Sequence, residues 1–383
     1  PGLKGRVFVP GDGKTRTKKK HPCRDCFDCH ICTDGRCRVC RAVPFSPDPD
    51  KGIIRPKPGI SEMDEEKRQK KYENQAQMLA NRVKKKFKHL KKRYDRQNLE
   101  VFRLYDWDIP EIRAVVDWYK GHLVIGEYTR KQSTPDWLPM MGESVAKALA
   151  LPKENLHLKK RKAGIKEGRR YQRINHTNLK IPMWERDLQF YINPSDYVDT
   201  GLFSDHRNTR MMVREMAQGR RFLNLYCYTG AFTCYAAKGG AGKSVSVDRS
   251  ETAIKWAGQN LELNGLSSPD HELIQSDVMD FLSRAGQEYS DFDLAVVDPP
   301  SFSSTRMTSA HFDIARDHPD LLNRVFNRMK KKGVVFFSTN HQNFDLKTDE
   351  LKALDCKEIT SLTIPEDYVS KRRQIHRCWK ILV

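Results

Sequence analysis

Between Arg221 and Phe302, short apolar runs alternate with helical patterns, and three of the apolar runs end at an acid. The three acids are Asp248, Asp277 and Asp298. Short strands that alternate with helices are typical of a doubly wound sheet of parallel strands. Because parallel strands place their carboxyl ends at one edge, we expect the three acids to line a single crevice there.

The first turn in this segment narrows the class of ligand. The sequence Tyr-Thr-Gly-Ala-Phe-Thr at 228–233 contains a single glycine, Gly230, which allows a ligand to approach the backbone closely. It lacks the G-x-G-x-x-G pattern that cradles a pyrophosphate at a helix N-terminus. A cofactor without phosphate is therefore favoured over a nicotinamide or flavin dinucleotide, and S-adenosylmethionine (SAM) is such a cofactor.

Each acid suits one part of a nucleoside cofactor. Asp248 can accept hydrogen bonds from both ribose hydroxyls, and Asp277 can accept one from the exocyclic amine of adenine. Asp298 precedes Pro299 and Pro300, which withhold N–H donors and so direct carbonyls and the acid into the crevice. A single acid at a strand end is more often a helix cap or a turn residue, so the prediction depends on their order together.

Five segments of the sequence carry a family resemblance. They are Tyr-Val-Asp-Thr-Gly-Leu-Phe-Ser-Asp-His-Arg at 197–207, 223–230, Asn-Gly-Leu at 264–266, Asp-Pro-Pro-Ser-Phe-Ser at 298–303 and Arg-Gln-Ile-His-Arg-Cys-Trp at 373–379. Together they resemble the bacterial 23S ribosomal RNA guanine-N7 methyltransferases. In some bacteria this enzyme is the C-terminal half of a fused protein that also makes N2-methylguanine. The resemblance covers about residues 80–383, and with no second SAM pattern upstream we expect a stand-alone form.

The resemblance implies a Rossmann-like class I SAM-dependent methyltransferase domain, with Phe203, Asp205 and Arg207 closing over the methionine end of SAM. The predicted cofactor-binding residues are Phe203, Asp205, Arg207, Asn224, Tyr226, Tyr228, Thr229, Gly230, Asp248, Arg249, Asp277, Val278 and Asp298. An ordinary structural ion pair is the alternative for Arg207.

Methyl transfer to guanine N7 needs no general base, because this nitrogen carries an in-plane lone pair. Catalysis is then mainly the positioning of N7 in line with the methyl–sulfur bond. We predict that Asp298 and the Pro299 carbonyl orient the base edge and that Phe302 stacks on the base, with a core role as the alternative for Phe302. A base in a helix must first leave its stack.

Four other functions compete with guanine-N7 methylation. Cytosine-C5 methylation needs a cysteine nucleophile, and the matching segment after the fifth strand, 337–341, has none. Adenine-N6 enzymes typically carry an aromatic residue directly after the two prolines, whereas Ser301 stands here. Guanine-N2 chemistry and an RNA-binding assembly factor with a SAM fold stay as alternatives, although three retained acids disfavour the latter.

The charge balance agrees with an RNA partner, either 23S ribosomal RNA or a large-subunit precursor. The chain has 69 Lys and Arg against 49 Asp and Glu, a formal net charge of +20, which favours a polyanion. Two basic segments, at 61–105 and 159–173, are poor in acids, whereas a solvated face usually mixes both signs. The predicted RNA-binding residues are Lys85, Lys88, Lys92, Lys160, Arg161, Arg169 and Arg170. The run that begins at Lys159 is expected to be a flexible loop.

The sequence divides into four predicted parts. Residues 1–60 form a Cys-rich basic segment, and 61–98 form a basic amphipathic helix with apolar residues from Leu79 to Tyr94 on one face. A small α+β domain that grips RNA is expected at 99–193, and the methyltransferase domain at 194–383.

Six of the ten cysteines fall between Cys23 and Cys40. Their C-x-x-C spacing suits tetrahedral Zn²⁺, while an iron–sulfur cluster or a reduced tail is the alternative. The simplest ligand set is Cys23, Cys26, Cys37 and Cys40. The sequence has no recognisable secretory signal or membrane span, so we expect a cytoplasmic protein without disulfides. The family resemblance implies a monomer.

Overall fold

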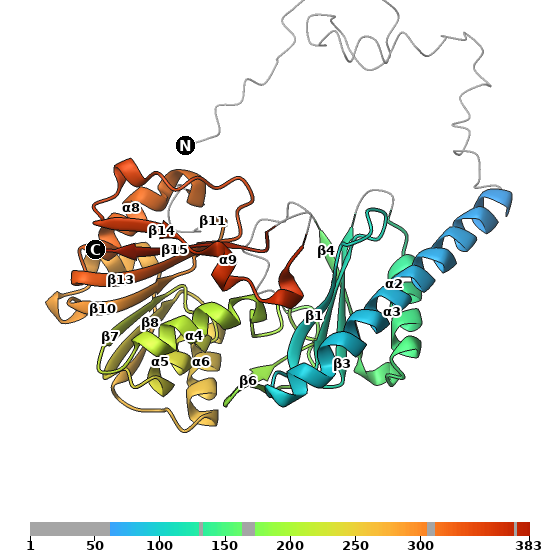
Figure 1. Ribbon diagram of the computed structural model, residues 1–383, viewed down its shortest axis with the longest axis horizontal. Coiled ribbons are helices and arrows are strands. Elements are labelled where there is room, and N and C mark those ends of the chain that lie inside the picture. Colours follow the sequence, from blue (N-terminus) through green and yellow to red (C-terminus); the bar gives the residue numbers. More distant parts are fainter. Residues whose placement is uncertain (1–61, 130–132, 163–172, 305–310, 371–373) are drawn as a thin grey trace, which may run out of the picture. The chain divides into compact units, whose positions relative to one another are not determined.

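The computed structural model describes residues 62–129, 133–162, 173–304, 311–370 and 374–383. Residues Glu66–Val383 form one compact unit (Figure 1). The four predicted zinc ligands, together with Arg169 and Arg170, lie outside the described residues, as do the side chains of Arg161 and Phe302. The predictions for these residues therefore stay predictions.

The basic helix is confirmed as α2, Glu62–Arg96. Its apolar stripe is buried against a four-stranded sheet, with Leu79, Val83, Leu90 and Tyr94 all at most 3% exposed. Spacings of four and three residues bring these side chains to one face, because an α-helix turns once every 3.6 residues. The opposite face of α2 is left to its charged residues.

The four-stranded sheet has the order β1-β2-β3-β4, and α3 (Trp137–Ala148) connects the parallel pair β3 and β4. Its strands are β1 Val101–Asp106, β2 Ala114–Tyr119, β3 His122–Thr129 and β4 Leu156–Lys162. A separate hairpin, β5 (Ile181–Glu185) and β6 (Leu188–Ile192), follows.

The prediction of a flexible loop beginning at Lys159 was wrong for its first four residues. They complete β4, and Lys159 is only 3% exposed. Its Nζ donates to the carbonyls of Tyr197 and Val198, at 2.6 and 3.2 Å. A buried ammonium needs such acceptors, so this lysine is structural, whereas Lys160 next to it is exposed.

The seven-stranded sheet has the order β14-β15-β13-β10-β7-β8-β9. Its strands are β7 Arg221–Leu225, β8 Lys243–Asp248, β9 His271–Gln275, β10 Phe292–Val297, β13 Met329–Thr339, β14 Asp355–Glu358 and β15 Arg377–Leu382. A short hairpin, β11 (Phe302–Ser304) with β12 (His311–Asp313), follows β10. The doubly wound α/β class is confirmed, with one correction: β15 runs antiparallel to both of its neighbours.

Helices cover both faces of this sheet (Figure 1). On one face α7 (Val278–Arg284) and α8 (Ile314–Phe326) pack on alternate strand residues such as Leu223 and Ala295. On the other face α4 (Arg207–Met216) and α5 (Ala231–Lys238) pack on Phe222 and Leu294. Burial on both faces explains why the strands read as continuous apolar runs.

The strand order reverses between β7 and β10, which are neighbours although β8 and β9 lie between them in sequence. Ligands of doubly wound folds bind at such a switch point, outside the carboxyl ends of the strands. The predicted acids occupy that edge: Asp248 ends β8, Asp277 follows β9 and Asp298 follows β10.

A buried ion pair joins the basic helix and the small sheet to the methyltransferase sheet. Asp367, in the short helix η7 (Glu366–Tyr368), accepts two bonds from the Arg207 guanidinium at 3.0 and 3.1 Å. The same carboxylate accepts the backbone N–H of Arg103 in β1 and the hydroxyl of Tyr94 in α2.

None of the described helices is long and apolar enough to cross a membrane.

Candidate cofactor and base site

The turn between β7 and α5 adopts a strained path. Tyr226, Tyr228 and Gly230 all have left-handed backbones, with φ of 58°, 48° and 73°. Left-handed φ is uncommon for residues other than glycine, and such strain clusters at binding sites. The turn is held by the Thr229 hydroxyl, which donates to the Gly201 carbonyl at 2.6 Å.

We expect Gly230→Ala to destabilise the protein by roughly 2–4 kcal/mol, because it adds both left-handed strain and a clash. A Cβ at Gly230 would lie 2.8 Å from the Cβ of Ala257 and 3.3 Å from its Cα, in the backbone of α6 (Glu251–Leu263). Gly219 is a matched control, since its φ is 68° and a Cβ there meets nothing within 4 Å. Urea unfolding of both variants measures the difference, and equal losses would contradict the clash.

Asp248 is fixed by two backbone donors. Its Oδ2 accepts the N–H of Tyr228 at 3.0 Å, and its Oδ1 accepts the N–H of Ser250 at 2.9 Å. Burial raises the pKa of this carboxyl, and the two N–H bonds act in the opposite direction. Each oxygen keeps a lone pair, so the fixed carboxylate suits the ribose role predicted for it.

Asp277 is both a cap and a candidate ligand. Its Oδ1 caps α7 by accepting the N–H groups of Met279 and Asp280, at 2.9 and 3.3 Å. Its other oxygen has no partner among the described residues, so it is available for the bond predicted from the adenine amine. Tyr226 lies beside it, and burial, followed by the charges of Asp277 and Asp248, raises the pKa of this phenol, which therefore stays protonated at neutral pH.

Asp298 is oriented by its neighbours at the end of β10. Its Oδ1 accepts the hydroxyl of Ser338 in β13 at 2.6 Å, and its Oδ2 lies 3.5 Å from Nε2 of His206. The side chain is 28% exposed. A carboxylate that is anchored through one oxygen and partly open through the other is suited to hold a substrate edge.

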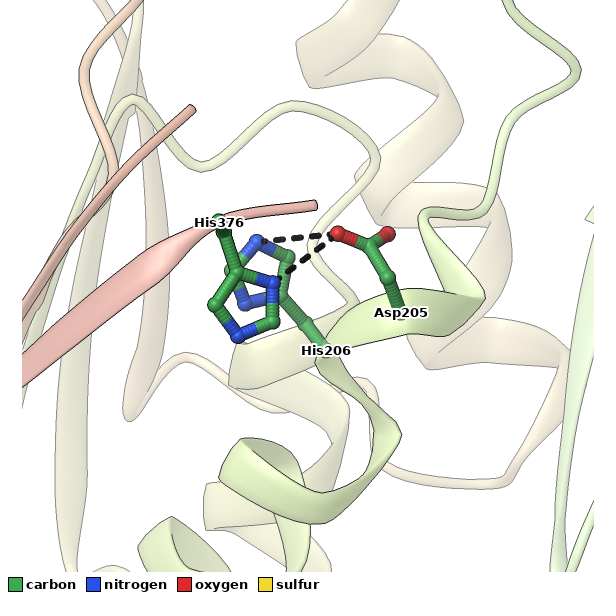
Figure 2. A group of neighbouring side chains, drawn as sticks. All are labelled: Asp205, His206 and His376. Carbon is green, nitrogen blue, oxygen red and sulfur yellow. Dashed lines mark hydrogen bonds and ion pairs between the residues drawn. The ribbon is translucent and has the colours of Figure 1, made fainter. Parts of the chain in front are cut away.

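The segment before α4 reaches this edge through η4, Ser204–His206. Phe203 is 39% exposed, and its ring centroid lies 5.1 Å from that of Tyr228. Asp205 contacts His376 through Oδ2, and the imidazole of His206 lies alongside (Figure 2). Sequence reasoning missed both histidines, although each stands inside a segment that carries the family resemblance.

Some predicted cofactor residues make contacts that favour a structural role. Arg207 is 2% exposed and bound to Asp367, which fits the structural ion pair that was its alternative. The amide of Asn224 is buried and donates to Thr233 at 2.9 Å. Val278 belongs to the sheet core, whereas the side chain of Arg249 is exposed.

The outer face of α2 carries lysines without a carboxylate partner among the described residues. Lys85, Lys88 and Lys92 are exposed, at spacings of three and four that place them on one side of the helix. Other bases of this helix pair with acids: Arg82 with Asp108, Lys91 with Asp95 and Arg93 with Glu366. These three lysines are among the seven residues predicted to contact RNA.

Comparison with known proteins agrees with the acid-lined edge. The family profile described as S-adenosylmethionine-dependent methyltransferase matches residues 171–366. The chain is 39% identical over 310 residues to ribosomal RNA large subunit methyltransferase K of Neisseria meningitidis, covering 79% of this chain and 86% of that protein. It is also 39% identical over 343 residues to methyltransferase K/L of Magnetococcus marinus, covering 88% of this chain but 46% of that longer relative.

Solved structures share the fold. The crystal structure of SMU.776, a methyltransferase complexed with SAH, has a TM-score of 0.64 at 19% identity, covering 81% of this chain and 82% of that one. A SAM-dependent methyltransferase from Streptococcus mutans has a TM-score of 0.63 at 20% identity, covering 81% of each chain.

The doubly wound sheet and the acids at its switch point therefore define a class I methyltransferase whose cofactor is SAM. The chain belongs to the family of ribosomal RNA large subunit methyltransferase K.

Proposed function

We propose that this protein transfers the methyl group of SAM to N7 of a guanine in 23S ribosomal RNA. The observation that carries the proposal is the oriented Asp298 carboxylate at the switch point, held by Ser338 and beside His206. The relatives named as ribosomal RNA large subunit methyltransferases support the choice of RNA.

The proposed chemistry uses this carboxylate as an acceptor. Guanine presents N1–H and N2–H donors on one edge and the N7 lone pair on the opposite side of the ring system. If Asp298 accepts from the donor edge, N7 stays free for in-line attack on the methyl carbon. As the bond from sulfur to carbon breaks, positive charge moves onto the base, and a fixed carboxylate stabilises that charge. No proton has to be removed.

The cysteines of the described region support a purine nitrogen over cytosine C5. The strand β13, which neighbours β10, is followed by Asn340 and His341 and offers no thiol at this edge. Cys227 follows β7, but burial, followed by the charge of Asp248, raises the pKa of its thiol well above the ordinary value. A thiol held in this neutral form is a poor nucleophile.

Replacing N7 tests the proposal directly. We expect a substrate transcript made with 7-deazaguanosine, in which a C–H stands in place of N7, to accept no methyl group while the matched guanosine transcript is methylated. Transfer of labelled methyl from SAM measures both. Equal methylation of the two transcripts would refute the N7 assignment and favour guanine N2, adenine N6 or cytosine C5.

The RNA contact is tested by salt dependence. Replacing Lys85, Lys88 and Lys92 with alanine should weaken RNA binding and lower the slope of log K against log salt by roughly 2–3, since each phosphate contact contributes about 0.7–0.9. The SAM affinity should not change.

A control triple variant removes the same charge from exposed lysines outside α2. Lys243, at the start of β8, Lys331, near the start of β13, and Lys352 are exposed. An equal change of slope in both triple variants would show that net charge alone drives binding, and would contradict a specific contact along α2.

A further inference from the structure

Two buried histidines lie beside the carboxylate of Asp205 (Figure 2). Nδ1 of His376 is 3.1 Å from Oδ2 of Asp205. Nε2 of His206 is 3.7 Å from the same oxygen and 3.5 Å from Oδ2 of Asp298. His206 and His376 are 5% and 2% exposed, so solvent does not supply these contacts.

The partners of His376 define its charge. Its Nε2 lies 3.0 Å from the hydroxyl of Thr363, and that hydroxyl donates its own proton to the Thr360 carbonyl at 2.9 Å. Nε2 must then donate to Thr363, and Nδ1 donates to the carboxylate of Asp205. A histidine that donates from both nitrogens is an imidazolium. His376 is therefore the counter-ion of Asp205.

His206 is the neutral member of the pair. Its ring stacks on that of His376, with centroids 4.3 Å apart and an interplanar angle of 12°, and two stacked cations would repel each other. Burial lowers the pKa of His206. Its Nδ1 is buried without a partner among the described residues, so the single proton belongs on Nε2, which faces the two carboxylates.

Asp205, His206 and His376 hold potential metal-ligand atoms within 4.8 Å of one another. A metal ion bound to a histidine lies in the plane of the ring, along the nitrogen lone pair. Two nearly parallel rings stacked 4.3 Å apart cannot both direct a lone pair at one ion. The geometry instead fits a hydrogen bond between His376 and Asp205, with the ring of His206 stacked on that of His376.

We propose that His376 and His206 are positioning residues for methyl transfer. His376 holds Asp205 ionised and aimed at the ammonium group of the SAM methionine end, and His206 spaces Asp205 from the base-holding Asp298. In this arrangement Oδ1 of Asp205 has no partner among the described side chains and can accept the ammonium. The inference rests on the proposed function only for the role of Asp298; the role of His376 concerns the cofactor alone.

Calorimetry with two ligands tests the role of His376. S-adenosylhomocysteine carries the amino acid end, and 5′-methylthioadenosine lacks it. In His376→Asn the amide nitrogen can replace Nδ1 and keep the bond to Asp205, whereas in His376→Gln it reaches the Nε2 position and keeps only the bond to Thr363. We expect His376→Gln to bind S-adenosylhomocysteine about tenfold or more weakly, the size of one charge-assisted hydrogen bond. His376→Asn, which keeps the hydrogen bond but not the charge, should lose less affinity than His376→Gln, and methylthioadenosine binding should be the same in all three proteins.

A general packing role would weaken both ligands in both variants, and that result would overturn the inference. Thermal unfolding identifies variants that do not fold; in that case Asp205→Asn replaces them, with the same expected loss for S-adenosylhomocysteine only.

For His206, the Gln variant keeps a donor near Nε2 and should retain more of kcat at saturating SAM than the Asn variant, and equal kcat values would overturn its role. If the methylated product is anything other than 7-methylguanosine, the proposed function is refuted. The calorimetric result for S-adenosylhomocysteine and His376 is not affected by that outcome.

Discussion

Asp298→Asn is expected to lower kcat for methyl transfer by about 10²–10³-fold, the size found when one oriented electrostatic contact to a transition state is removed. The amide keeps the shape of the carboxylate and can still accept the Ser338 hydroxyl that bonds Oδ1. It loses the negative charge that stabilises the cationic base. Single-turnover transfer from labelled SAM measures the effect separately from product release.

Asp248→Asn is the matched control. This acid also ends a strand at the same edge, but its proposed contact is to the ribose, so its substitution should weaken the affinity for SAM and change kcat little. The Asp298→Asn protein should bind S-adenosylhomocysteine nearly as the wild type does, because this product has lost the sulfonium charge. Retention of full kcat in Asp298→Asn would show that the acid is only a turn residue.

Asp367→Ala is expected to destabilise the protein by about 3–5 kcal/mol, because it leaves the charge of Arg207 buried without its partner. The two side chains are 0% and 2% exposed. The carboxylate also accepts bonds from Arg103 and Tyr94, so three separate elements lose an acceptor at once. Urea unfolding measures the loss, which is a large share of the stability of an ordinary domain.

An exposed ion pair gives the comparison. Asp320 pairs with Arg324 at 2.9 Å on the surface of α8, and the two side chains are 59% and 40% exposed. Asp320→Ala should cost less than about 1 kcal/mol, since water screens such a pair. Similar losses in Asp320→Ala and Asp367→Ala would contradict the view that Asp367 is the buried centre that joins α2, β1 and α4.

Much of the fold could be predicted, because local patterns determine it. The strands β2, β6 and β10 coincide with apolar runs between turn residues, which is the pattern that predicts a strand. The acids at 248, 277 and 298 lie on the predicted edge, because parallel strands bring their carboxyl ends together. β14 is short and mostly exposed, so its sequence contains no apolar run that would predict a strand.

The rest could not be predicted, because it depends on contacts between segments distant in sequence. The partner of Arg207 is 160 residues away, so the sequence could not separate a cofactor contact from a structural ion pair. His206 and His376 meet only after β15 returns beside β13 in the antiparallel direction. Lys159 stands in a basic run, and only the fold shows that its ammonium is buried and bonded to two backbone carbonyls.

The identity of the modified nucleoside tests the central claim most directly. Unmodified 23S ribosomal RNA is incubated with the purified protein and SAM, digested to nucleosides and analysed by mass spectrometry. We expect 7-methylguanosine in the complete reaction and its near absence with Asp298→Asn. Formation of N2-methylguanosine, 5-methylcytidine or N6-methyladenosine in its place would contradict the proposed function.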